Sequence, residues 1–469
     1  MELKEITSRD VDFAKWYTNV VMKADLVDYS SVKGSMIIRP LGYAIWEQMQ
    51  RILDNMFKET GHENVQMPMF IPESLLNVEK EHVEGFAPEV AWVTHGGGEK
   101  LEERMCVRPT SEVLFCEHFK KIINTYRDLP KLYNQWCTIV RWEKTTRPFL
   151  RSREILWQEG HTMHRTEEEA REETIKMFNI YKKFQEEYLA LPVITGRKTD
   201  KEKFAGAEET YTIEAMMYDG YALQNGTSHY FGKHFAEVFG IKFIDQDNKY
   251  KTPYQTSWGV TTRMIGSIIM THGDDNGLVL PPKIAPFKVI IIPIGDVSSK
   301  LEELENDLKL AGITYKVDNS NKTPGFKFAE AEVKGYPIRI ELGARDLKEN
   351  KVTLVRRDTL EKITVKYEDI ISKVNYLLDT IQNDMFERAK ARRDSMIYEA
   401  NNYDELADIA KNKSGFIKIN WCGNQECEDK IKDDFGIKSR CLIDNEKVTG
   451  PCTVCGKDAK NRLYIGRQY

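Results

Sequence analysis

Hydrophobic spacing predicts a helix near the start of the chain and a short extended segment after it. Apolar residues recur every three or four positions in residues 41–60, which predicts an amphipathic helix. The apolar face consists of Ile45, Met49, Ile52 and Met56. Gly61 follows and is a favourable residue for ending a helix. Residues 64–72 are apolar but carry two prolines, so they predict a strand at a sheet edge or an interface.

In residues 131–162 the pattern of side chains alternates with a period of two residues. This alternation predicts a strand, a polar loop and a second strand. The first strand is expected to place on one face Cys137, Ile139, Arg141 and Glu143. The second is expected to place on one face Ile155, Trp157, Glu159 and His161. Thr166 and Glu169 then form a capping box, which predicts the start of a long helix.

The second half of the chain divides at a proline-rich stretch, residues 278–288, which predicts a domain junction. After it, short apolar strands alternate with helical segments, the pattern of a compact α/β domain with a mixed sheet. The remainder is a small cysteine-bearing region. We therefore expect three domains, at residues 1–283, 284–384 and 385–469.

Composition narrows the class of protein. The 469 residues include 41% hydrophobic and 30% charged residues, with a net charge of −5, which argues against a generally basic nucleic-acid coat. The polar first ten residues do not resemble a signal peptide, and no apolar run is long enough to span a bilayer. Eight cysteines in so long a chain do not make a secreted disulfide framework, so we expect a cytoplasmic protein without a membrane anchor.

Charge is concentrated in the loop between the two predicted strands. Arg141 is expected on the first strand, and the loop adds Lys144, Arg147, Arg151 and Arg153. A solvated hairpin tip explains most such clusters. However, Arg141 alternates with large apolar residues, and a half-buried guanidinium needs an anionic partner such as phosphate or carboxylate. We therefore favour an anion-binding site.

Four cysteines near the C-terminus have the spacing of a metal site. They form one four-spaced and one two-spaced pair, Cys422, Cys427, Cys452 and Cys455. Buried free thiols or a redox pair are the alternatives, but neither accounts for two such pairs in one small region. Four thiolates suit a closed, structural, tetrahedral Zn²⁺ site.

Three segments carry a resemblance to a known family. The stretch "RWEKTTRPFLRSREILWQEGHT" resembles motif 2 of class II aminoacyl-tRNA synthetases, and its flanks look like those of prolyl-tRNA synthetases. "GHENVQMPMF" is similar to motif 1, in which Pro68 would lie at a homodimer interface. "SWGVTTRMIGSIIMTHGDDNGLVLPP" resembles motif 3 with Arg263 at its arginine, although Thr262 stands where many class II members carry Glu. The resemblance covers essentially the whole chain.

The resemblance implies that the protein joins L-proline to tRNA(Pro) through a prolyl-adenylate, using ATP with Mg²⁺ and releasing pyrophosphate and AMP. Arg141 and Arg263 would be the catalytic residues, since the protein's task is to align two anions and stabilise the developing charge. The implied ATP-binding residues are Arg141, Glu143, Arg151, Ser152, Gln224, Thr227, Thr261 and Arg263. No Walker-type glycine loop is present, which argues against a P-loop ATPase.

The resemblance also implies a proline pocket. Its residues are Thr110, Glu112, Arg141, Trp157, Glu159, His161, Phe204, His229, Ser257 and Gly259. A secondary ammonium needs two acceptors, which Thr110 and Glu112 can offer, while aromatic residues suit the ring. Thr110 or Ser111 can equally be a helix N-cap, and each aromatic taken alone is more often plain core.

By the same resemblance the fold is that of a multidomain α+β and α/β protein. It would combine an antiparallel class II catalytic domain, an α/β anticodon-binding domain and a small zinc-binding α+β domain. The implied anticodon contacts are Glu341, Arg345, Lys351 and Arg356, although ordinary surface ion pairs explain each of them as well. A threonyl- or seryl-specific relative and a tRNA-binding protein without activity are the alternatives. The Thr110/Glu112 pair and the presence of Arg141, Glu143 and Arg263 argue against them.

Overall fold

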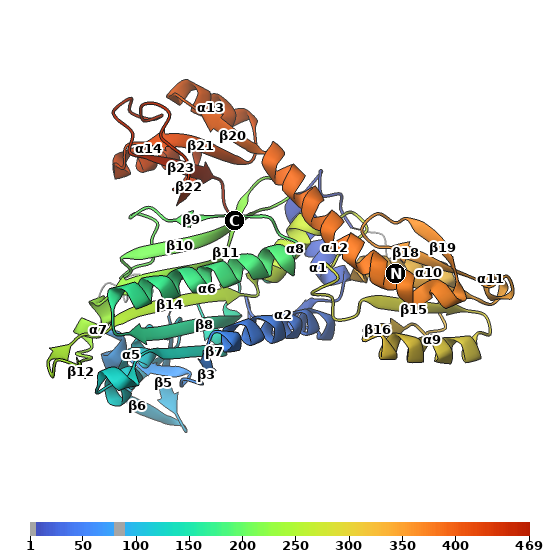
Figure 1. Ribbon diagram of the computed structural model, residues 1–469, viewed down its shortest axis with the longest axis horizontal. Coiled ribbons are helices and arrows are strands. Elements are labelled where there is room, and N and C mark those ends of the chain that lie inside the picture. Colours follow the sequence, from blue (N-terminus) through green and yellow to red (C-terminus); the bar gives the residue numbers. More distant parts are fainter. Residues whose placement is uncertain (1–5, 79–89) are drawn as a thin grey trace.

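A seven-stranded sheet forms the centre of the computed structural model, which describes residues 6–78 and 90–469 (Figure 1). The strand order is β3-β7-β8-β14-β11-β10-β9, antiparallel except for the parallel pair β3 and β7. The strands are β3 (Glu63–Asn64), β7 (Lys131–Val140), β8 (Glu154–His164), β14 (Tyr254–Thr261), β11 (Ala222–Gly232), β10 (Glu209–Met216) and β9 (Val193–Arg197).

Helix α6 (Glu167–Glu187) lies along one face of this sheet (Figure 1). It begins with the predicted capping box of Thr166 and Glu169. Its residues Tyr181 and Phe184 are buried with Trp258 of β14 in the main hydrophobic core. Since α6 covers this face, a site built on the sheet must use the other face or the strand ends.

Helix α2 (Pro40–Glu59) confirms the first predicted helix, and Gly61 follows it with a positive φ of 85°. The predicted apolar face is partly wrong. Ile45 and Met49 are buried, but Ile52 and Met56 lie at its border. The buried stripe continues instead through Trp46, Leu53 and Phe57, and the rings of Trp46 and Phe57 contact Trp136 of β7.

Smaller elements complete the first region. Residues 64–72 do not form one strand: β3 ends at Asn64 and β4 begins at Phe70, with Pro68 between them. The three-stranded sheet β4-β6-β5 consists of β4 (Phe70–Pro72), β6 (Glu99–Val107) and β5 (Ala91–Gly96). The remaining elements are α1 (Phe13–Lys23), β1 (Val27–Tyr29), β2 (Met36–Ile38), α3 (Glu73–Leu76), α5 (Glu112–Ile122), α7 (His234–Val238), β12 (Phe243–Ile244), β13 (Tyr250–Lys251) and α8 (Arg263–His272).

The α/β region confirms the predicted alternation after the proline-rich junction. Its mixed sheet has the order β16-β15-β17-β18-β19. The elements are β15 (Val289–Ile294), α9 (Ser298–Leu310), β16 (Tyr315–Val317), α10 (Pro324–Lys334), β17 (Ile338–Gly343), α11 (Ala344–Lys348), β18 (Lys351–Arg356), β19 (Lys362–Lys366) and α12 (Ile370–Ser395). The expected boundary at residue 384 falls inside α12, which leads directly into the last region (Figure 1).

The cysteine-bearing region has a sheet in the order β20-β21-β23-β22. Its elements are β20 (Ile397–Ala400), α13 (Tyr403–Asn412), β21 (Phe416–Trp421), α14 (Gln425–Phe435), β22 (Lys438–Leu442) and β23 (Asn461–Gly466). The chain then returns to the central sheet, where the backbone N–H of Tyr469 donates to the carbonyl oxygen of Ala222 at 3.1 Å. Within the described residues, no helix is both long and apolar enough to cross a membrane.

The close approach of β8 and β14 depends on a glycine. A Cβ at Gly160 would lie 2.1 Å from the ring of Trp258, which is 1% exposed. We expect Gly160→Ala to lower the free energy of unfolding by about 1–3 kcal/mol, because the ring cannot move without disturbing the core. Chemical denaturation measures this. Gly325→Ala is the control, since nothing lies within 4 Å of its added Cβ; equal stability of the two variants would contradict the packing argument.

Candidate active site

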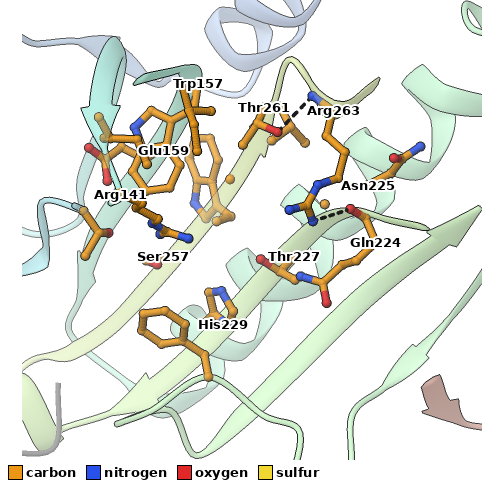
Figure 2. A pocket seen from close by; sticks show the side chains of 18 of the residues that line it. Arg141, Trp157, Glu159, Gln224, Asn225, Thr227, His229, Ser257, Thr261 and Arg263 are labelled. Atoms are coloured by element: carbon orange, nitrogen blue, oxygen red, sulfur yellow. Dashed lines mark hydrogen bonds between the residues drawn. The ribbon is translucent and has the colours of Figure 1, made fainter. Parts of the chain in front are cut away.

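A cleft opens over β8, β14 and β11 at the ends of β7 and α8 (Figure 2). It has about 1060 Å³ of free space, counted to its open mouth. The predicted site residues that line it are Thr110, Glu112, Arg141, Ser152, Trp157, Glu159, Phe204, Gln224, Thr227, His229, Ser257, Gly259, Thr261 and Arg263. Antiparallel register brings them together, because Thr227 and Glu159 both face Gly259 in neighbouring strands.

Two arginines reach into the cleft from different sides (Figure 2). Strand β7 ends at Val140, so Arg141 begins the loop instead of extending the strand face, and the interpretation of Arg141 and Glu143 as strand residues is wrong. One backbone hydrogen bond continues past the strand end, from the Arg141 N–H to the Arg153 carbonyl at 2.9 Å, and it closes the base of the loop. The Arg141 Nε donates to the Pro109 carbonyl at 3.1 Å, and its guanidinium lies 5.3 Å from the centre of the Trp157 ring.

Arg263 stands at the start of α8, where its guanidinium donates to the carbonyl oxygen of Gln224 at 3.2 Å. Burial, together with the positive charges of Arg151 and Arg141, lowers the pKa of Arg263 to about 10. The group therefore remains charged at neutral pH. Cations gathered in this way favour an anionic ligand, which would offset both the desolvation and the mutual repulsion.

Glu143 and Arg151 do not line the cleft. Both lie in the loop between β7 and β8, where Arg151 pairs with Glu143 at 3.5 Å. Ser152 does line the cleft, and its hydroxyl donates to the carbonyl oxygen of Glu154 at 2.6 Å. The charged loop thus contains an internal ion pair near its base and contributes Arg141 and Ser152 to the cleft.

The end of the cleft that Glu112 and Glu159 line is rich in carboxylates. Glu159 is 3% exposed and accepts hydrogen bonds from the Ser111 hydroxyl at 2.5 Å and the Gln135 amide at 2.5 Å. Although burial favours its protonated form, hydrogen bonds from His161, Ser111 and Gln135 hold the pKa of Glu159 below its ordinary value. Glu159 is therefore an anion at neutral pH, close to Glu112.

His161 lies behind this end of the cleft. It is fully buried, stacks on Phe115 at 4.2 Å between ring centres, and its Nε2 lies 3.1 Å from Glu159. Ligand atoms of Glu112, Glu159 and His161 lie within 4.8 Å of one another. A cationic group of a ligand fits this end, with His161 holding Glu159 in place.

The Thr110 hydroxyl donates to the Glu112 carboxylate at 2.5 Å. Ser111 occupies the N-cap position of α5, yet its side chain makes no capping hydrogen bond. The Ser111 hydroxyl donates to the Glu159 carboxylate instead. The helix-cap alternative for Thr110 and Ser111 therefore does not describe their hydrogen bonds.

Aromatic side chains form a wall of the cleft. Trp157 lies beside Arg141, and the rings of Phe204 and His229 are 4.7 Å apart. His229 also hydrogen-bonds the Thr210 hydroxyl at 2.9 Å through Nδ1. Burial lowers the pKa of His229 to about 3, with smaller contributions from Lys198 and His161, so the ring is neutral at physiological pH.

Several residues of the cleft were missed by the sequence analysis. They include Phe149, Lys198, Glu202, Thr210 and Asn225. Lys198 is buried, and its ammonium lies 3.7 Å from Glu214. Lys198 stands among the charged residues 197–203, and the sequence pattern does not set it apart from them. Only its burial in the structure identifies it as a residue of the cleft.

The four predicted cysteines lie together in the last region. The Sγ atoms of Cys422 and Cys427 are 3.7 Å apart, as are those of Cys422 and Cys455. All four sulfurs lie within 4.8 Å of one another. Gly423 and Gly456 adopt positive φ beside them, as tight turns require.

The predicted anticodon residues divide into two kinds. Glu341 and Arg356 are buried in ion pairs, Glu341 with Arg339 at 2.9 Å and Arg356 with Asp384 at 2.6 Å. Arg345 and Lys351 are exposed at α11 and at the start of β18. Arg345 and Lys351 are therefore accessible to a partner, whereas Glu341 and Arg356 are engaged in ion pairs within the domain.

Family models match three successive parts of the chain. Residues 92–272 match the tRNA synthetase class II core domain (G, H, P, S and T), and residues 288–377 match an anticodon-binding domain. The antiparallel sheet, its cleft and these matches define a class II aminoacyl-tRNA synthetase. Residues 403–469 match the prolyl-tRNA synthetase C-terminal domain.

Comparison with full-length relatives narrows the class II synthetases to one family. The chain is 61% identical to a proline–tRNA ligase of Lachnospira eligens and 59% identical to a proline–tRNA ligase 2 of Bacillus cereus, covering 100% of this chain and 98% and 99% of those proteins. The crystal structure of prolyl-tRNA synthetase from Cryptosporidium parvum, complexed with halofuginone and AMPPNP, superposes with a TM-score of 0.95 at 40% identity and full coverage of both chains. The chain belongs to the prolyl-tRNA synthetase family and is an aminoacyl-tRNA ligase.

The neutral state of His229 has a measurable consequence. Its pKa is about 3 in the folded protein and about 6.5 in an unfolded chain, so the unfolded state binds more protons between these values. The contribution of His229 to stability is therefore complete above about pH 6.5 and falls, by at most about 1.4 kcal/mol per pH unit, as the pH is lowered.

We expect the difference in unfolding free energy between the unmodified protein and His229→Gln to change with pH below 6.5 and to be constant above it. Glutamine retains a polar partner for Thr210 but does not titrate. Denaturation at several pH values between 4.5 and 8 measures the difference. A difference that is constant over the whole range would contradict the assignment of a buried, neutral imidazole.

Proposed function

We propose that this enzyme activates L-proline with ATP in the cleft described above and then transfers it to the 3′ end of tRNA(Pro). The observation that carries the proposal is the presence of buried charge of both signs in one cleft. Arg141 and Arg263 supply its cationic part, and Glu112 and Glu159 supply its anionic part. Proline carries a carboxylate and a secondary ammonium, so it can lie between the two parts.

In the first step, a carboxylate oxygen of proline attacks the α-phosphorus of ATP and the bond to pyrophosphate breaks. Arg141 would contact both the carboxylate and the α-phosphate, and Arg263 the γ-phosphate. Preorganised cations of this kind stabilise the charge that develops on the phosphate oxygens. Mg²⁺ accompanies ATP in this class and would supply further positive charge to the phosphates.

The remaining predicted nucleotide residues surround these arginines. Gln224, Thr227 and Thr261 lie on β11 and β14 near Arg263, and Ser152 lies in the loop after Arg141. Glu143 would accept from the adenine amino group once the loop that holds its pair with Arg151 encloses the nucleotide. In the second step, the ribose hydroxyl at the tRNA end attacks the prolyl carbonyl, and AMP leaves.

The proline ring would occupy the aromatic wall. Thr110, Glu112 and Glu159 supply oxygen acceptors for the ammonium, with His161 supporting Glu159 from behind. Trp157, Phe204 and His229 enclose the ring, and Ser257 and Gly259 form the floor.

The four-cysteine cluster supports a structural zinc site. Sulfurs bound to one tetrahedral zinc at about 2.3 Å are about 3.8 Å apart, and the observed separations of Cys422 from Cys427 and from Cys455 are 3.7 Å. The cluster lies outside the cleft, so the metal would stabilise the fold and take no part in the reaction. All eight cysteines are free thiols, which agrees with a cytoplasmic location.

Two surfaces would serve macromolecular partners. The segment that resembles motif 1 exposes Pro68, Met69 and Phe70, the last two at 47% and 42%, and apolar exposure of this kind supports a homodimer interface. Arg345 and Lys351 are exposed on the anticodon-binding domain and would contact the tRNA. Glu341 and Arg356 would reach a base only by exchanging their present ion pairs.

The role of Arg141 can be tested directly. We expect Arg141→Ala to reduce proline-dependent exchange of pyrophosphate into ATP by at least about 100-fold, because one preorganised donor to the reacting oxygens is lost. Lys144→Ala is the matched control, since Lys144 is exposed in the same loop and does not line the cleft. Exchange that persists in a folded Arg141→Ala protein would contradict the assignment.

Metal content tests the cysteine cluster. We expect about one zinc per chain in the purified protein, released by a chelator together with a loss of thermal stability. Cys455→Ser should lower the zinc content, whereas Cys106→Ser should leave it unchanged, because Cys106 is a buried thiol in a different core. A natively folded protein that binds no zinc would refute this part of the proposal.

A further inference from the structure

The segment Lys198–Phe204, which we name the pocket loop, connects β9 to the region before β10. Three of its side chains line the cleft, namely Lys198, Glu202 and Phe204. Phe204 belongs to the aromatic wall, with its ring 4.7 Å from that of His229. The position of this loop therefore sets the width of the proposed proline site.

Two other side chains of the pocket loop contact the cysteine-bearing domain. The Thr199 hydroxyl donates to the Glu428 carboxylate at 2.8 Å, and both residues are buried. The Ser439 hydroxyl donates to the same carboxylate oxygen, which fixes Glu428 from β22. The Lys201 ammonium pairs with Asp429 at 2.5 Å.

Charges behind the loop form a second connection. Glu214 of β10 is fully buried and lies 3.7 Å from Lys198 on one side and 3.7 Å from Arg440 of β22 on the other. The Thr212 hydroxyl donates to Glu214 at 2.8 Å. Lys198 thus reaches the cleft while its charge is balanced through a carboxylate shared with the C-terminal domain.

From these contacts we infer that Glu428 and Asp429 are positioning residues for proline binding, acting through Thr199 and Lys201 on the pocket loop. Both acidic residues lie on α14, immediately after Cys427. The helix that carries part of the cysteine cluster therefore also holds one wall of the cleft. The C-terminal domain contributes to substrate recognition without touching the substrate.

The inference rests on the proposed placement of proline. Its test therefore compares the effect on KM for proline with the effect on KM for ATP. We expect the double variant Thr199→Val/Lys201→Met to raise KM for proline about threefold to tenfold, the effect of losing one or two hydrogen bonds that hold the wall. KM for ATP and kcat should change less than about twofold, since the loop does not carry the nucleotide residues. Pyrophosphate exchange with each substrate varied in turn gives these constants.

Two controls accompany this experiment. Thr199→Ser/Lys201→Arg keeps the hydroxyl and the charge, so its KM for proline should equal that of the unmodified enzyme. Lys430→Met changes α14 on its exposed side, where Lys430 pairs with Asp434, and should also leave this KM unchanged. If the first double variant proves unstable, Lys201→Met alone carries the test, because Lys201 lies at the edge of the contact.

An unchanged KM for proline in the folded Thr199→Val/Lys201→Met protein would overturn the inference. Equal increases in both KM values, or a rise in Lys430→Met, would also overturn it, because they indicate a general loss of structure. Absence of proline-dependent exchange in the unmodified enzyme would instead overturn the proposed function, so the two failures are distinguishable.

Discussion

Desolvated charge of both signs, held a short distance apart in one cleft, is the constraint on which the rest of the structure depends. Burial and neighbouring cations lower the pKa of Arg263, yet it stays charged. Glu159 stays ionised in the same cleft because His161, Ser111 and Gln135 hydrogen-bond it and hold its pKa below its ordinary value. A ligand with matching charges relieves both desolvation costs, so binding energy and orientation come from the same contacts.

The antiparallel sheet makes this arrangement possible. Neighbouring strands β8, β14 and β11 place Glu159, Gly259 and Thr227 in line across the sheet. The cleft lies above them, and α6 covers the opposite face. Gly160 allows Trp258 to pack tightly between these layers. The sheet therefore carries the floor of the site, and the loop between β7 and β8 adds Arg141 and Ser152 to the cleft.

Periodicity predicted the main helices and strands because it reports on local structure, whereas most residues of the cleft came from the resemblance to a known family. The helix starting at Thr166, the paired strands around the charged loop and the cysteine cluster are all present. The predictions were wrong where tertiary packing, and not the spacing of residues, decides which side chains are buried or where a strand ends. Trp46 and Phe57 shift the buried face of α2, and Pro68 divides the expected strand. Whether Lys198 is buried, or Thr199 meets Glu428, depends on contacts between residues far apart in the chain, which no spacing reveals.

Exchange of labelled pyrophosphate into ATP by the unmodified enzyme, with each of proline, alanine, serine and threonine supplied alone, tests the central claim most directly. The charge separation and the aromatic wall predict rapid exchange with proline and slow exchange with serine and threonine, because a secondary ammonium and an apolar ring match the cleft. Exchange that is absent with proline, or equally rapid with threonine, would contradict the account.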